Sequence, residues 1–224
     1  MKNFDEIVNN IINNPLFLRL KDVEENNSYH DHEKTYDHLI KTFETAKVQL
    51  KGEFIKNENA KKLFLEFINT PFDNLTNGEV MLLTSLLHDV GKILWYKDQD
   101  TEHPLRHEDN NGIVTNPGHE YWGSTIVGEF VKDTGLSEKV LEKIVKVIRL
   151  HDTFSSSYME PKLNLPLDEL IDDIKARAEG SYIEALFNVY CDCFWAKPFE
   201  KSKEKIIEVF NQPSLYSKRT YFIK

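Results

Sequence analysis

The residues of this chain best suited to chemistry are His88 and Asp89, which adjoin in the segment Leu-Leu-His-Asp-Val-Gly-Lys at positions 86–92. They follow an apolar run, residues 80–87, that covers too much of a helix surface for an amphipathic face, so we expect a buried helix. Burying an imidazole and a carboxylate is costly unless they are paired or bind a cation, and this pair suits a divalent transition metal. Taken alone, the heptapeptide also fits a capping aspartate beside a core histidine.

Two more polar residues lie in apolar surroundings. His38 precedes Leu39 and Ile40, and Asp192 lies within Val-Tyr-Cys-Asp-Cys-Phe-Trp at positions 189–195. Each alone is typical of a satisfied core residue or a surface group. Together with the first pair they supply two imidazoles and two carboxylates, a set adequate for one catalytic metal ion with positions open to water. We therefore predict that the metal ligands are His38, His88, Asp89 and Asp192.

Two histidines and a lysine are candidates for further roles. His119 follows Pro117-Gly118 at the start of one predicted helix, and His151 ends another. Spacing leaves three interpretations open for them: a second metal site with Asp89 as the bridge, hydrogen bonds to a substrate phosphate, or ordinary helix termini. Lys92 is close enough to the metal pair for its ammonium to meet an anionic substrate, although a solvated lysine fits equally. The remaining histidines lie in polar loops and receive no chemical role: His30, His32, His103 and His107. His103 and His107 would be the exceptions if the later loop closes inward.

These residues must be positioned by helices. Helical spacing of apolar residues predicts helices near 4–12, 35–50, 63–67, 119–132, 137–150 and 167–178, with Pro15 as a stop and Pro198 opening the last helix. Capping-box patterns at 76–79 and 181–184 predict two further helix starts. Strand alternation is absent from the sequence, so we predict an all-α helical bundle with a metal site in its core.

The segment from Trp95 to Pro117 is polar and rich in turn residues. Loops of this length within compact domains are usually functional or disordered. We therefore expect residues 98–117 to form a lid over the metal site.

Length and charge set outer limits. The 224 residues suit one domain, 1–224, with its core motifs in 28–197. With a net charge of −9, the protein is not expected to have the broad basic surface of a dedicated nucleic-acid binder. We expect neither a signal peptide nor a membrane span. Cys191 and Cys193 are too few for a structural zinc site and are poorly spaced for a disulfide, which favours a cytoplasmic protein.

The order His38, His88-Asp89, His119, His151, Asp192 resembles that of the HD superfamily of metal-dependent phosphohydrolases, over about residues 28–197. The Gly-His-Glu and Ile-Arg-Leu-His elements are similar to those in the HD region of bacterial tRNA nucleotidyltransferases, although this chain has no room for their catalytic head. The resemblance does not extend to the cyclic-dinucleotide-cleaving HD-GYP branch, because Asp152 follows His151 where a second histidine is expected and the GYP element is absent.

The resemblance implies an HD-type phosphohydrolase holding one or two divalent ions, with Mn, Mg, Fe, Ni, Co and Zn all open. A metal-activated water would cleave a phosphomonoester or phosphodiester of a small nucleotide-like substrate. Asp89 and Lys92 are the expected catalytic residues, and Lys92, His119 and His151 the expected phosphate contacts. Two alternatives remain: a di-iron oxygenase on the same scaffold, and a nucleotide-sensing module without turnover. The sequence leaves the oligomeric state open.

Overall fold

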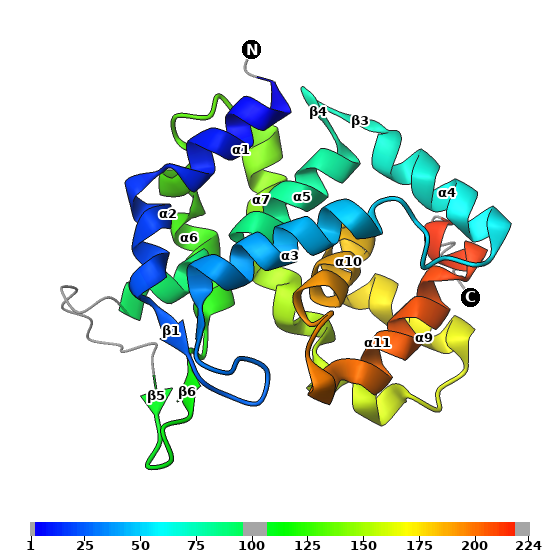
Figure 1. The fold of residues 1–224 in the computed structure, drawn as a ribbon. Helices are drawn as coiled ribbons and strands as arrows, with labels where there is room; N and C mark the ends of the chain where they lie inside the picture. The colour runs from blue at the N-terminus through cyan, green and yellow to red at the C-terminus, as the bar shows by residue number, and fades with distance from the viewer. Residues whose placement is uncertain (1–2, 96–106, 218–224) are drawn as a thin grey trace.

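The computed structural model describes residues 3–95 and 107–217 (Figure 1). Helices dominate this part of the chain. The α-helices are α1 (Phe4–Ile12), α2 (Pro15–Arg19), α3 (Thr35–Gln49), α4 (Glu58–Asn69), α5 (Asn77–Leu87), α6 (His119–Val131), α7 (Glu138–Leu150), α8 (Ser156–Met159), α9 (Leu167–Arg177), α10 (Tyr182–Asp192) and α11 (Glu200–Phe210). The 3-10 helices are η1 (Leu20–Asp22), η2 (Val90–Trp95), η3 (His151–Phe154), η4 (Glu160–Lys162), η5 (Lys197–Phe199) and η6 (Pro213–Tyr216).

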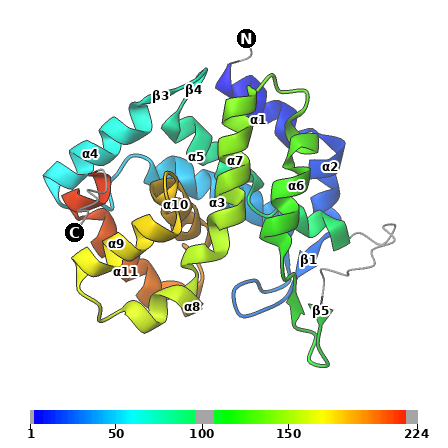
Figure 2. The same ribbon diagram turned by 180° about the vertical axis from the view of Figure 1, so that it is seen from behind.

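Helices α3, α5, α7 and α10 form the middle of the molecule. Figures 1 and 2 show α1, α2 and α6 on one side of them and α4, α9 and α11 on the other. One apolar cluster fills each side, and Leu82 of α5 packs against both clusters. Since α5 lies between the two cores, it is apolar all round, as the residues before His88 indicated.

The prediction of a helical bundle is confirmed, and the described residues also form three small β-hairpins. Each has two-residue strands: β1 (Glu24–Glu25) with β2 (Glu33–Lys34), β3 (Pro71–Phe72) with β4 (Leu75–Thr76), and β5 (His107–Glu108) with β6 (Val114–Thr115). Strands this short leave no alternating pattern in the sequence.

The two predicted capping boxes differ in whether the structure contains them. The capping box at Thr76 is confirmed: its hydroxyl accepts from the Glu79 amide at 3.2 Å, and its own amide donates to the Glu79 carboxylate at 2.7 Å. The helix start predicted at 181–184 is also confirmed, since α10 begins at Tyr182, but the capping box itself is wrong: Ser181 makes no side-chain cap, and Lys143 binds both side chains, Ser181 at 3.2 Å and Glu184 at 2.7 Å. Pro15 opens α2 at its first turn instead of only ending α1.

Part of the predicted lid, residues 98–106, lies outside the described residues. The described remainder contains the β5–β6 hairpin, which is tied to the loop between β1 and β2. The Val114 amide donates to the Asn26 carbonyl at 2.7 Å, and the Asn27 side chain donates to the Val114 carbonyl at 3.1 Å. Within 3–95 and 107–217, the helices all fall short of the length and apolar character needed to cross a bilayer.

Candidate metal centre

The four predicted ligands and the two candidate histidines, His119 and His151, come from the ends of five helices. His38 lies in the first turn of α3, and His119 is the first residue of α6. His88 and His151 are the residues at which α5 and α7 end, and Asp192 is the last residue of α10. Five helix ends therefore converge on Asp89, which follows His88 and is itself buried.

Gly91 explains how η2, which follows α5, approaches the start of α6 so closely. A β-carbon built at Gly91 would lie 2.0 Å from the His119 carbonyl oxygen and 2.5 Å from the Gly123 amide nitrogen. Only a residue without a side chain fits there. The glycine of the heptapeptide therefore lets η2 pack on the start of α6, and His119 Nε2 lies 2.9 Å from Asp89 Oδ1.

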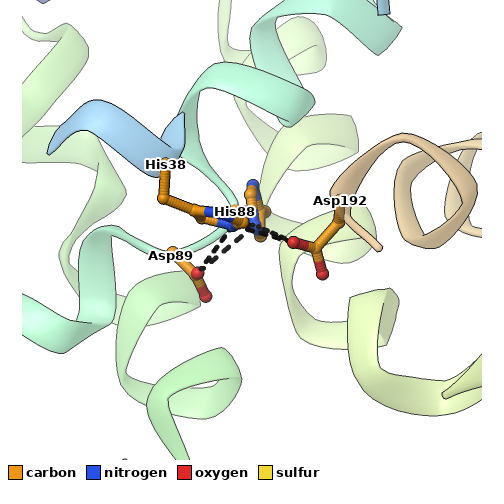
Figure 3. Close-up of side chains that lie close together, drawn as sticks. All are labelled: His38, His88, Asp89 and Asp192. Atoms are coloured by element: carbon orange, nitrogen blue, oxygen red, sulfur yellow. Dashed lines mark hydrogen bonds and ion pairs between the residues drawn. The ribbon is translucent and has the colours of Figure 1, made fainter. Parts of the chain in front are cut away.

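The first group of ligands, which we call half-site 1, comprises His38, His88, Asp89 Oδ2 and Asp192 (Figure 3). His38 Nε2 lies 2.8 Å from Asp192 Oδ1 and 3.5 Å from Asp89 Oδ2. His88 Nε2 lies 3.3 Å from each of the same two oxygens. Figure 3 shows the four side chains pointing toward one another from three parts of the chain, with His38 on α3, Asp192 on α10, and His88 and Asp89 adjacent at the end of α5.

Half-site 2 comprises Asp89 Oδ1, His119 and His151. His119 Nε2 is 3.0 Å from His151 Nε2, and the latter is 3.5 Å from Asp89 Oδ1. The two oxygens of Asp89 therefore face different half-sites. A carboxylate in this position is placed to bridge two ions.

The histidines present the same ring nitrogen to the centre because their other nitrogens are engaged. A metal-binding histidine typically donates from its second nitrogen to a carbonyl or carboxylate, which fixes the ring and the tautomer. The Nδ1 contacts are His88 with Ser85 O at 3.0 Å, His119 with Asn116 O at 2.7 Å, His151 with Ile148 O at 2.6 Å and His38 with Glu33 Oε2 at 3.5 Å.

These residues fit a metal ion. The Nε2 atoms of two histidines face each other within each half-site, 3.2 Å apart between His38 and His88, and a neutral ring with its proton on Nδ1 offers a lone pair there. Asp89 Oδ1 is buried, and although His119 Nε2 lies 2.9 Å away, none of the described residues donates to this oxygen with hydrogen-bond geometry. A buried acceptor without a donor is costly, and a cation between these atoms would satisfy all of them.

The electrostatics of the site also call for positive charge at its centre. Burial lowers the pKa of His38, but Asp192, Glu33 and Asp89 outweigh burial and raise that pKa to about 9. Burial raises the pKa of Asp89, but Lys92 and His88 hold it well below its usual range. Carboxylates that strongly favour protonated histidines would favour a divalent cation in the same place.

The sequence did not identify a set of polar residues behind the centre, which we call the hairpin network: Glu25, His30 and Glu33. They come from β1, β2 and the loop between them. Glu33 Oε2 is 2.8 Å from His30 Nδ1, and its contact with His38 Nδ1 orients a predicted ligand. The His30 ring packs edge-on against His38, with centroids 4.6 Å apart, although His30 was given no chemical role from sequence.

Lys92 is placed differently from the ammonium expected at an anionic substrate. It is buried, and it donates to Asp89 Oδ2 at 2.6 Å and to both Glu25 oxygens at 2.8 and 2.9 Å. An ammonium has three protons, and three carboxylate oxygens occupy them here. Glu25, which the sequence did not single out, is the reason for this difference.

A cavity of about 550 Å³ opens beside the centre. Its wall includes His38, Asp89, His119, His151 and Asp192, so these candidate ligands, though not His88, face a space that admits a small molecule. The rest of the wall comes from the hairpin network, from residues 113, 115, 116, 155–157 and 195–196, and from other residues near them. The described part of the predicted lid thus contributes Ile113, Thr115 and Asn116 to the cavity.

The chain was compared with known protein families and with curated proteins. The sequence profile of the HD domain matches residues 35–178, which include every proposed ligand except Asp192. A search of curated proteins finds no match. The family match supports membership of the HD superfamily. The narrower resemblance to the HD region of tRNA nucleotidyltransferases is not shown by it. The chain belongs to the HD domain family.

Proposed function

Because the chain belongs to the HD domain family, whose members are typically metal-dependent phosphohydrolases, we propose that it hydrolyses a phosphate ester of a small nucleotide-like molecule. The observation that carries this proposal is the position of Asp89. Its two buried oxygens face two groups of histidine and carboxylate ligands beside a cavity of about 550 Å³. We further propose that residues 1–224 act as one domain.

Half-site 1 would hold one divalent ion through His38, His88, Asp89 and Asp192, and half-site 2 a second through Asp89, His119 and His151. A bound divalent ion supplies charge that polarises a phosphoryl oxygen and makes a water ligand more acidic. His119 and His151 would serve as phosphate contacts instead if only half-site 1 is filled.

Asp89 would orient the attacking water, because a carboxylate with a strongly lowered pKa is a poor proton acceptor. Lys92 would act through Asp89 by holding Oδ2 at 2.6 Å. Direct contact between Lys92 and a phosphate would require the substrate to displace Glu25 from its ammonium. Excluding bulk water from this buried group strengthens each of these interactions.

The test is a screen of phosphorylated metabolites and nucleotides for release of inorganic phosphate. The purified protein is stripped with a chelator and then supplied separately with Mn, Mg, Fe, Ni, Co or Zn. We expect turnover that depends on the added metal and disappears in Asp89→Ala. Oxygen uptake by an iron-loaded protein that releases no phosphate would instead support the di-iron oxygenase. Tight nucleotide binding without either reaction would support the sensing module.

A further inference from the structure

The cavity beside the metal centre has an apolar outer part that hydrolysis itself does not require. Six large apolar side chains are exposed among the described residues, and three of them line this cavity: Tyr29, 37% exposed, Ile113, 44%, and Trp195, 63%. We call these three residues the aromatic rim. Single exposed apolar residues are ordinary, but several at one cavity mark a binding surface.

Both aromatic rings of the rim are held by their polar atoms. Trp195 Nε1 donates to the Thr45 hydroxyl at 3.2 Å, and that hydroxyl donates to the Lys41 carbonyl at 2.8 Å. The Tyr29 hydroxyl donates to Ser156 Oγ at 2.8 Å. With the polar ends satisfied, the ring bodies remain exposed in fixed positions, which lowers the entropy cost of binding a flat ligand.

The charges that line the cavity limit how many phosphates it accepts. The described wall carries five carboxylates: Glu25, Glu33, Asp89, Asp152 and Asp192. Its ammonium groups are Lys92, occupied by Glu25 and Asp89, and Lys41, whose Nζ donates to Glu33 Oε1 at 3.3 Å. One phosphate would meet the metal centre, whereas each additional phosphate would meet carboxylates whose cations are already paired.

We propose, on the basis of the function proposed above, that the aromatic rim binds a planar aromatic group and that the substrate is a nucleotide-like ester with a single phosphate. The ring stacks on Trp195 while the phosphate lies at the metal centre. A cavity of about 550 Å³ lies within the range of roughly 300–1,000 Å³ that is usual for sites of small ligands.

The experiment compares three probes: adenosine 5′-monophosphate, ribose 5-phosphate, which lacks the ring, and adenosine 5′-triphosphate. We expect the monophosphate to be hydrolysed with the highest kcat/KM. Trp195→Ala should lower that value about tenfold or more, as loss of one base–aromatic stack does, and should leave ribose 5-phosphate unchanged. Trp195→Phe should retain most of the activity, because phenylalanine keeps a ring face. Tyr121→Ala removes an exposed aromatic side chain outside the cavity wall and is the matched control.

Binding of adenosine to metal-free protein, measured by calorimetry, separates this inference from the proposed function. Adenosine binding that is lost in Trp195→Ala would support the aromatic rim whether or not the protein releases phosphate. Failure to release phosphate would overturn the proposed hydrolysis and leave the aromatic rim standing. Equal hydrolysis of ribose 5-phosphate and the monophosphate would overturn the rim and leave hydrolysis standing. Preference for the triphosphate, or an equal loss on both monophosphate probes in Trp195→Ala, would also overturn the inference.

Discussion

The two half-sites share Asp89 but differ in charge and in what supports their histidines. Half-site 1 adds Asp192 to Asp89, and Glu33 stands behind His38. Half-site 2 has one buried oxygen, from Asp89, and both of its histidines rest on backbone carbonyls. Its other carboxylate, Asp152, is exposed and lies farther away, 3.7 Å from His151 Nε2. More buried carboxylate charge favours a divalent cation more strongly. We therefore expect half-site 1 to bind a divalent ion more tightly than half-site 2.

Removing the shared residue should abolish that difference. In Asp89→Ala both half-sites lose a carboxylate oxygen, so we expect bound metal to fall toward zero. Activity should fall by about a thousandfold or more, since the charge stabilisation lost is several kcal/mol. Metal analysis and phosphate release on the same sample check the result. Unchanged metal content would show that Asp89 is a metal ligand in neither half-site.

The buried lysine tests how Oδ2, the oxygen facing half-site 1, is held. Lys92→Met leaves Glu25 without its cation in a buried position, so we expect the free energy of unfolding of the metal-free protein to fall by about 3–5 kcal/mol. Urea unfolding measures this loss. The double variant Glu25→Gln/Lys92→Met should recover part of it. A single variant as stable as the parent would mean that Lys92 and Glu25 are not a buried pair.

Variants confined to one half-site should separate the two. Asp192→Ala should weaken the tighter ion, by about a hundredfold in affinity or more, and His151→Ala should remove only the weaker ion. Dialysis against a metal buffer followed by metal analysis distinguishes them. If His151→Ala keeps its metal content and weakens only substrate binding, His151 is a phosphate contact. If it changes neither, the residue is an ordinary helix terminus.

The smallest effect is expected from the support behind His38. Glu33→Gln removes the charge facing Nδ1 while keeping an oxygen acceptor, and should weaken metal binding at half-site 1 by roughly tenfold. Half-site 2 should be unaffected. Glu44→Gln, an exposed glutamate of α3 paired with Lys47, is the control. An equal change in both variants would assign the effect to surface charge.

The sequence predicted the helices that carry the ligands better than the contacts among them. His38, His88 and Asp192 lie on or directly after helices whose apolar spacing is visible in the sequence, so their position in or beside the core was expected. Glu25 and Glu33 belong to a polar stretch without any period. They become buried or half-buried only because the β1–β2 hairpin folds against Lys92 and His38, which are distant in sequence.

The wrong capping box has the same cause. Ser181 and Glu184 have the right spacing, and the local pattern was therefore convincing. Lys143, which is distant in the chain, offers a charge that competes for both side chains, and it prevails. A spacing pattern within four residues predicts only contacts among those residues. It carries no information on a lysine that is distant in sequence and contacts both side chains.

Gly91 bears on which ions the centre accepts. Because η2 and the start of α6 meet backbone against backbone at this residue, the separation of Asp89 and His119 is set by peptide groups instead of by adjustable side chains. Packed backbones yield little, and close-packed interiors transmit strain. An ion whose preferred ligand distances match this fixed spacing binds without deforming the protein, and a larger or smaller ion strains it. The close backbone packing that Gly91 permits should therefore make the site selective for ions of one radius.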